Sequence, residues 1–461
     1  MAKLYIFGIG GTGSRVLRSL TMLMASGVNI DINEIVPIII DPDVANADLT
    51  RTVSLMNKYH TLRSKLHFDN KNPNQFFKVD LNKIFPNYLL NIKNTDSISF
   101  QQFIDYASMS KENQALTKML FSEKNLQSSM DVGFKGNPNI GSVVLNQIVD
   151  SDEFEKFANS FQSGDKIFII SSIFGGTGAS GFPLLLKTLR IGKSFPNFNL
   201  INQADIGALT VLPYFKLNPS NTSEIDSSTF ISKTKSALAY YEEDIIKSGS
   251  INSLYYLADD ITNTYNNSEG GVTQANDAHL IEFLGATAII DFANNLQSET
   301  TNKELGIKDI SGAVSFDSFY SEMRSMLYTP MVQFTLLANA LLDKSDYFIS
   351  STFAANRFFN DFYDRAFFSD LKGFCQKYRE WLIEMKRNKR SLDLFNTTCG
   401  NKPFELITGV KPRKVLSHLS DYDLIADRLN SAIRHCKSKD KEDLFLEMFY
   451  SGTKKLIKEK L

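Results

Sequence analysis

Short apolar runs alternate with helical patterns in the first two-thirds of the chain, whereas the remainder is almost entirely helical in pattern. Runs rich in β-branched residues predict strands that are covered on both faces, as in a parallel sheet. These runs lie at 3–7, 34–40, 166–171, 208–212 and 254–257. Residues 52–130 look polar and irregular, with scattered helical pattern. Helices are expected at 14–25, 228–247, 322–343, 353–388, 403–408, 418–436 and 441–460.

One further segment, residues 276–292 (NDAHLIEFLGATAIIDF), is apolar almost all round, which predicts a helix buried between two domains. Strands alternating with helices, followed by helices only, predict an α/β fold. We expect a doubly wound, mostly parallel sheet in a nucleotide-binding domain at 1–275 and a central linking helix at 276–295. An α-rich C-terminal domain at 296–461 would end in an amphipathic tail helix.

Glycine-rich loops stand between predicted strands and predicted helices at residues 8–14 (GIGGTGS) and 175–181 (GGTGASG). Glycines let the backbone approach a phosphate closely, and a helix N-terminus offers free N–H groups and partial positive charge. Neither loop carries the lysine of a P-loop, so backbone amides, Thr177 and Ser180 would hold the phosphates. One such loop alone also suits tight helix–strand packing, but two in one chain favour phosphate binding.

In sequence and order, these loops resemble those of the tubulin/FtsZ superfamily, and a bacterial tubulin-like branch fits most closely. The GGGTG[ST]G loop of that family is similar to residues 174–181, with phenylalanine in place of the first glycine. The GxGGxGxN loop is similar to residues 8–15, with arginine where FtsZ often has asparagine. Residues 41–43 (DPD) resemble the loop after the second strand, and 136–141 (GNPNIG) resemble the family's Asn-Pro loop.

This resemblance implies a site for GTP or GDP with Mg²⁺. The residues implied are Gly10, Gly11, Thr12, Gly13 and Ser14 for the α- and β-phosphates; Gly175, Gly176, Thr177, Gly178, Ala179 and Ser180 for the β- and γ-phosphates; Gly136 and Asn137 near the γ-phosphate; Asp43, beside Asp41, for the metal; and Asn276 for guanine. His279, one turn further on, would either flank the base or serve as a core histidine.

The residues that support GTP hydrolysis in the tubulin/FtsZ superfamily have no clear counterpart in this sequence. In FtsZ and tubulin, acidic residues after the central helix complete the site of the next subunit, whereas residues 293–304 contain no DxxD. The candidates to replace them are Glu299, Glu304, Asp309 and Asp317. We therefore expect slow GTP hydrolysis coupled to longitudinal self-assembly into a homo-oligomer or filament. The alternative is a nucleotide-gated scaffold without significant catalysis, with the C-terminal helices offering a surface for a protein partner.

A competing resemblance is to ATP-dependent adenylating enzymes of the ubiquitin-activating/ThiF type. Residues 8–14, the DPD at 41–43 and Arg51 match that family's nucleotide motifs. Such enzymes need a catalytic cysteine downstream, but the three cysteines, Cys375, Cys399 and Cys436, all lie in the last quarter and form no CxxC. This alternative also leaves the second glycine loop unexplained.

Composition narrows the function only by exclusion. The 461 residues carry a formal net charge of -1, which argues against binding to nucleic acid through bulk charge. The basic cluster at 386–390 is interpreted as a solvated helix end. No stretch reaches the ~20 apolar residues of a membrane span. With no evident signal peptide and few, scattered cysteines, we expect a cytoplasmic protein.

Overall fold

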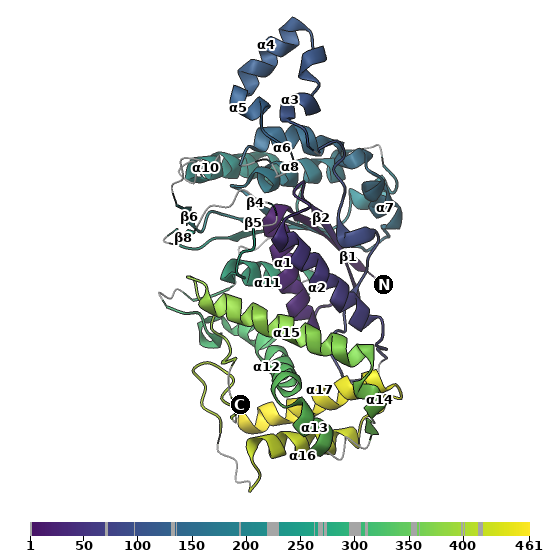
Figure 1. Ribbon diagram of the computed structural model, residues 1–461. Coiled ribbons are helices and arrows are strands. Elements are labelled where there is room, and N and C mark those ends of the chain that lie inside the picture. The colour runs from purple at the N-terminus through teal and green to yellow at the C-terminus, as the bar shows by residue number, and fades with distance from the viewer. Residues whose placement is uncertain are drawn as a thin grey trace.

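The computed structural model describes residues 2–461 except 70–71, 96, 131–133, 135, 193–194, 219–229, 262, 266–270, 272–273, 295–305, 309–311, 352–356, 359, 398–399, 401 and 414–417. At its centre is a six-stranded sheet whose neighbouring strands are all parallel (Figure 1). The strands are β1 (Lys3–Ile9), β2 (Glu34–Ile40), β3 (Asp80–Leu81), β4 (Lys166–Ser172), β5 (Ile206–Val211) and β7 (Ser253–Leu257). Their order in the sheet is β3-β2-β1-β4-β5-β7, and β6 (Lys216–Leu217) pairs with β8 (Thr264–Tyr265) separately.

The strands form where the apolar runs predict them. β2 has the predicted bounds, and β4, β5 and β7 lie within two residues of theirs. β1 continues two residues further than predicted, through Gly8 and Ile9. In β1, β2 and β4 every residue after the first is buried, as expected for strands covered on both faces.

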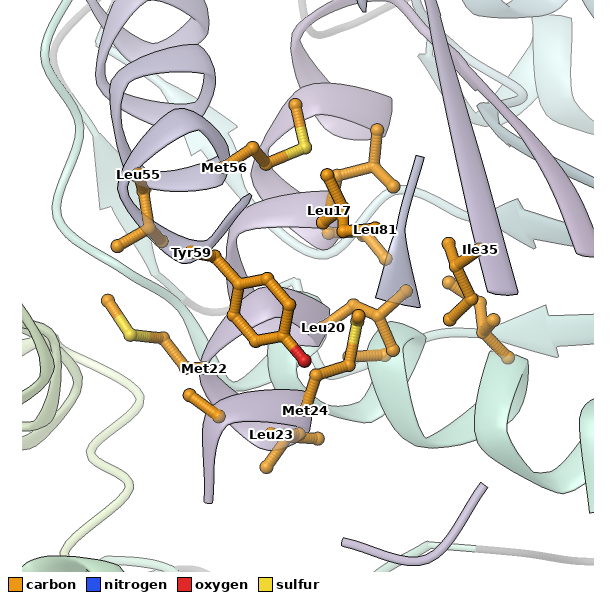
Figure 2. Packing of buried hydrophobic residues seen from close by; sticks show 14 of the residues in the cluster. Leu17, Leu20, Met22, Leu23, Met24, Ile35, Leu55, Met56, Tyr59 and Leu81 are labelled. Carbon is orange, nitrogen blue, oxygen red and sulfur yellow. The ribbon is translucent and has the colours of Figure 1, made fainter. Parts of the chain in front are cut away.

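Helices cover both faces of the sheet, so the predicted doubly wound α/β fold is confirmed. On one face lie α1 (Gly10–Ala25), α2 (Ala47–Arg63) and α11 (Leu280–Asn294), and on the other lie α6 (Pro138–Leu145), α7 (Asp152–Ser160), α8 (Gly176–Ile191) and α10 (Phe230–Tyr240) (Figure 1). Figure 2 shows apolar side chains of α1 gathered around Tyr59 and Met56 of α2, with Ile35 and Leu81 of the neighbouring strands beside them. The Tyr59 hydroxyl donates to the Val79 carbonyl at 2.7 Å, so the phenol is satisfied inside this core.

Between β3 and α6 the chain forms small helices that project beyond the sheet: α3 (Phe100–Phe103), α4 (Lys111–Leu120) and α5 (Glu123–Leu126) (Figure 1). Shorter turns of helix are α9 (Phe198–Ile201), the π-turn Tyr241–Ile246 after α10, and the 3-10 turns Pro86–Tyr88, Tyr106–Ser108, Asn146–Asp150 and Phe316–Ser318.

The remaining helices pack below the sheet domain. They are α12 (Ser321–Asp343), α13 (Ser345–Ser351), α14 (Asn360–Tyr363), α15 (Ala366–Arg387), α16 (Asp421–Ile433) and α17 (Lys441–Lys460) (Figure 1). The predicted α-rich C-terminal region is therefore confirmed, and α15 lies directly against α2. Within the described ranges, no helix combines the length and the apolar character needed to cross a membrane.

Four local predictions are wrong. The helix expected at 353–388 is interrupted after Tyr363, where α14 ends, and α15 begins only at Ala366. The stretch from residue 52 is not irregular at first, because α2 runs to Arg63 from an Asn46 cap whose side chain accepts two backbone N–H groups. The segment at 403–408 is not helical; it forms turns, and Ile407 bridges to Phe395. The central helix begins at Leu280, four residues later than Asn276, because the polar residues before it fold back onto α2.

Candidate functional site

The strand order reverses between β1 and β4, and this is the point where open parallel sheets bind ligands. Gly8 of β1 pairs with Ile170 of β4, so the two strands end side by side. Their following loops then separate, one entering α1 and the other entering α8 on the opposite face. A Cβ placed on Gly10 would lie 3.4 Å from Thr177 Cβ. The fold thus brings the first two glycine loops into contact at the switch point.

The loop at 136–141 (GNPNIG) lies against the other two glycine loops. A Cβ on Gly176 would lie 3.0 Å from the backbone nitrogen of Gly136, and a Cβ on Gly141 would collide with Ser180. Gly136 and Asn137 lead directly into α6, which packs along α8. The N-termini of α1, α6 and α8 therefore converge on one place.

These three N-termini differ from others in the chain. In α2, α4, α7 and α16 a Ser or Asn side chain caps the first turn, which also carries an acidic residue. Among the described residues, α1, α6 and α8 have neither a side-chain cap nor an acidic residue in the first turn. The short α9 and the long α15 share this feature, so what sets the three apart is that they also meet at the glycine loops. Their backbone N–H groups and partial positive charge are left for an anion from outside the chain.

The glycines in the loops meet two different requirements. Gly13 packs against the backbone of Gly8, and a Cβ on Gly178 would come within 2.7 Å of the Ser172 backbone, so both are needed for helix–strand contact. No described atom lies within 4 Å of a Cβ placed on Gly11 or Gly136. Gly136 has a φ of +76°. These two positions face open space, which a phosphate could enter.

The serine and threonine hydroxyl groups of the two glycine loops differ in whether they already donate a hydrogen bond within the chain. Ser14 Oγ donates to the Gly11 carbonyl at 3.0 Å, and Ser180 Oγ donates to the Gly176 carbonyl at 2.7 Å. Both serine protons are thus used inside their own helices. Thr12 and Thr177 are half-buried, and neither hydroxyl has a hydrogen bond within the part of the chain that the structure describes.

The two predicted acidic residues follow β2, which pairs with β1, so they lie at the same edge of the sheet. Asp41 and Asp43 are 6% and 4% exposed. Burial, together with the neighbouring Asp43 charge, raises the pKa of Asp41 to about 7, against the opposing hydrogen bond from the Asp43 N–H. Asp43 Oδ2 accepts from Gly271 N at 2.7 Å, whereas its buried Oδ1 has no partner among the described residues. An orphaned, buried carboxylate oxygen fits a cation ligand such as Mg²⁺.

Asn276 lies in the loop before α11, not on the helix. Its side-chain Nδ2 donates to Asp48 Oδ2 at 2.8 Å, its backbone N donates to Asp48 Oδ1 at 3.0 Å, and Arg51 Nη2 donates to its carbonyl at 2.5 Å. Asp48 therefore fixes the amide of the residue predicted to contact guanine. Sequence reasoning missed Asp48, although its place in the first turn of α2 was readable.

His279 is a core residue rather than an exposed one, with 3% of its surface accessible. Its Nδ1 accepts the Ile281 N–H at 3.0 Å, and its ring centroid lies 4.8 Å from that of Tyr214. Burial, reinforced by Arg15 and Arg390, lowers the pKa of His279 to about 3. The ring is therefore neutral at physiological pH.

Sequence reasoning also missed a lysine at the glycine loops. Lys233 of α10 donates from Nζ to the Gly136 carbonyl at 3.0 Å. Phe174, which replaces the first glycine of the family loop, is buried, with its ring centroid 5.0 Å from that of Phe230 on the same helix. Packing of Phe174 against Phe230 thus holds α10 beside the loop at 175–181. No sequence spacing linked Lys233 to Gly136, because 97 residues separate them.

Of the four candidate catalytic acids, the structure describes only Asp317. Glu299, Glu304 and Asp309 lie outside the described residues. Asp317 lies in the 3-10 turn between α11 and α12, where its side chain is 67% exposed and pairs with Arg324 at 2.7 Å.

The two described cysteines offer little to an adenylating enzyme. Cys375 is buried and Cys436 is half-buried, and desolvation raises the pKa of each thiol to about 12. A thiol that keeps its proton at neutral pH is a poor nucleophile. Cys399 lies outside the described residues.

Comparison with solved structures gives distant likenesses, among them two CetZ proteins. CetZ from Methanosaeta thermophila strain DSM 6194 aligns at a TM-score of 0.34 and 14% identity, over 66% of this chain and 57% of that one. CetZ2 from Haloferax volcanii, described as a GTPgS bound protofilament, aligns at 0.29 and 13%, over 64% and 58%. This chain thus spans less than two thirds of either neighbour. No family model and no curated protein matches the sequence.

Proposed function

We propose that the chain is a guanine-nucleotide-binding protein of the tubulin/FtsZ superfamily, in a bacterial tubulin-like branch. One observation carries the proposal: three helices that lack side-chain caps point their N-termini at a single switch point lined by glycines. A dinucleotide-binding fold needs only one glycine-rich turn after its first strand, whereas here the loops at 8–14 and 175–181 converge. The order of the loops along the chain, described above, supports the family over other nucleotide-binding folds.

The phosphates would lie between the loops. Backbone N–H groups at 10–14 would hold the α- and β-phosphates, and those at 175–180 the β- and γ-phosphates. Thr12 and Thr177 have hydroxyl protons to donate, and Lys233 would add positive charge at Gly136. Mg²⁺ would bind through the orphaned Oδ1 of Asp43 and would partly neutralise the phosphates.

The base would be read by Asn276. With one Nδ2 proton donated to Asp48, the carbonyl oxygen Oδ1 and the second Nδ2 proton are left to contact a ligand. A carbonyl accepts hydrogen bonds, and the Watson–Crick edge of guanine offers two neighbouring donors, N1–H and the amino group. The same edge of adenine offers one donor, the N6 amino group, beside an acceptor at N1, so an acceptor at Oδ1 can meet two donors on guanine but only one on adenine, which favours guanine.

Slow hydrolysis linked to longitudinal self-assembly is our proposal for turnover, with Glu299, Glu304, Asp309 and Asp317 as candidates for the acidic contribution from a neighbouring copy. A turnover assay at varied protein concentration tests it. Specific activity that rises with concentration supports assembly-coupled hydrolysis. Activity that stays flat near zero favours the nucleotide-gated scaffold.

Nucleotide binding itself is tested with two matched glycine variants. Gly11→Ala places a methyl group in open space at the first glycine loop, and Gly312→Ala places one in open space outside the candidate site. Both should fold as the wild type does, because neither methyl meets a described atom. We expect Gly11→Ala to weaken GTP binding at least ~10-fold, a loss of about 1.4 kcal/mol, and Gly312→Ala to leave it unchanged.

The nucleotide released from freshly purified wild-type protein should be GDP or GTP. Adenine nucleotide in its place would contradict the proposal, as would a folded Gly11→Ala variant that binds GTP like the wild type.

A further inference from the structure

A histidine and two aspartates meet away from the glycine loops, where the segment after α2 contacts the start of α17. His67 Nδ1 lies 3.1 Å from Asp443 Oδ2 and 3.5 Å from Asp440 Oδ2. The His67 backbone N–H donates to Asp443 Oδ1 at 2.9 Å. One potential ligand atom from each residue lies within 4.8 Å of the other two.

These separations suit a metal ion. Zn²⁺ binds imidazole nitrogen and carboxylate oxygen at about 2.0–2.2 Å in tetrahedral sites, so neighbouring ligand atoms are roughly 3.3–3.6 Å apart. The two distances from His67 Nδ1, 3.1 and 3.5 Å, need to change by only a few tenths of an ångström. A mixed set of one imidazole and two carboxylates suits Zn²⁺ better than Mg²⁺ or Ca²⁺, which prefer oxygen ligands alone.

The placement of Asp440 gives a second reason. Asp440 occupies the N-cap position of α17, where an aspartate ordinarily accepts a backbone N–H of the first turn. Among the described residues its carboxylate makes no such bond and faces His67 instead. Capping contributes about 1 kcal/mol, so a cap residue turned aside suggests that another partner holds its carboxylate.

The cluster is closed on one side and open on the other. Asp443 is 3% exposed, and burial raises the pKa of its carboxyl group. His67 and Asp440 are exposed, with 76% and 63% of their side chains accessible. A metal could therefore enter from solvent and keep an open coordination position for water.

We propose that His67, Asp440 and Asp443 form a divalent transition-metal site, with Zn²⁺ the best fit. The bound ion would fasten α17, in the C-terminal region, to the segment that follows α2. The alternative is that the three side chains form only a hydrogen-bonded ion pair, in which a proton on His67 takes the place of the metal.

The test is a Zn²⁺ titration of the full-length protein by calorimetry, after EDTA treatment and without nucleotide. We expect one equivalent to bind with a Kd in the micromolar range or tighter, and Co²⁺ in its place to give tetrahedral d–d absorption. His67→Ala and Asp440→Asn should each weaken binding at least 10-fold. His435→Ala, which removes another exposed histidine, should leave it unchanged.

Both substituted ligands are exposed, so folding should survive, and circular dichroism would verify this. The proposal is overturned if the wild type takes up no Zn²⁺ at millimolar concentration, or if folded His67→Ala binds it as the wild type does. Mg²⁺ competing equally with Zn²⁺ would also overturn it, because the donor set would then not be selecting the metal.

Discussion

Glu384 of α15 joins the C-terminal helices to the nucleotide domain, and its neutralisation is the most direct test of that junction. Its carboxylate accepts from Arg18 Nη1 and Nη2 at 2.8 and 3.1 Å, from Arg51 Nη1 at 3.2 Å and from Ala278 N at 2.9 Å. One side chain thus contacts α1, α2 and the segment that leads into α11. Glu384→Gln removes the charge and keeps the shape.

The expected loss follows from burial. The Arg18 side chain is 7% exposed and that of Glu384 is 12% exposed, so the substitution leaves a buried guanidinium without its counter-charge. Removing one partner of a buried pair costs roughly 3–5 kcal/mol. Arg51 keeps Asp48, and glutamine can still accept the Ala278 N–H, so we expect the lower end, about 3 kcal/mol. For a chain of 461 residues, that corresponds to a fall in Tm of roughly 3 °C.

Thermal unfolding followed by circular dichroism measures this loss, and Glu380→Gln is the matched control. Glu380 lies one turn earlier on α15 and pairs with Lys377 at 2.9 Å, with 40% of its side chain exposed. An exposed pair contributes about 0–1 kcal/mol, so the control should hardly move.

Two outcomes bear on the physical argument. Adding Arg18→Met to Glu384→Gln removes the orphaned charge and should recover part of the lost stability. The reasoning is refuted if Glu384→Gln and Glu380→Gln lower Tm equally, because burial would then not decide the value of the pair.

Three further predictions concern the switch point. The folded pKa of Asp41 is about 7, whereas an unfolded aspartate titrates near 4. Between these two pKa values the folded state keeps a proton that the unfolded chain releases, so the free energy of unfolding should fall as pH rises from about 4 to about 7. Asp41→Asn should flatten this pH dependence when Tm is measured across about pH 4–8. Asp43→Asn should lower GTP affinity about 10-fold in Mg²⁺ and leave it unchanged in EDTA, since each lost ligand oxygen weakens metal binding; an equal loss in EDTA would contradict a metal role. Lys233→Met should weaken GTP about 10-fold more than GDP in equilibrium binding, because Lys233 Nζ lies at the loop proposed to face the γ-phosphate; equal losses would place the lysine elsewhere.

The sequence predicts the sheet well because strands that are buried on both faces need apolar residues at almost every position. Residues 34–40 are apolar almost without interruption, and β2 has those bounds. The apolar periodicity of α2 is weaker, because polar residues such as Thr52 and Asp48 are buried along it beside apolar ones. Its start was nevertheless encoded by Asn46, whose side chain caps the helix.

The candidate site was only partly predictable, because its polar contacts join distant parts of the chain. Arg51 and Glu384 are 333 residues apart in sequence, and Asp48 and Asn276 are 228 apart. Neither pair has a spacing that a helix or hairpin imposes. The same limit explains the misplaced start of α11: the apolar pattern continues smoothly from Ala278, and only the contacts of Asn276 with α2 show that it lies outside the helix.

The glycines show most clearly how one residue type can answer two physical demands. Gly13 and Gly178 allow a helix to lie against the end of its own strand, a requirement that would exist without any ligand. Gly11 and Gly136 touch no described neighbour at the Cβ position, so packing gives no reason for glycine there. Gly136 needs its positive φ, whereas Gly11 lies in the first turn of α1 without a positive φ, so its backbone does not require glycine either. A glycine that neither packing nor backbone conformation requires is best explained by a ligand that must approach the backbone, which makes Gly11 the most informative of the loop glycines for nucleotide binding.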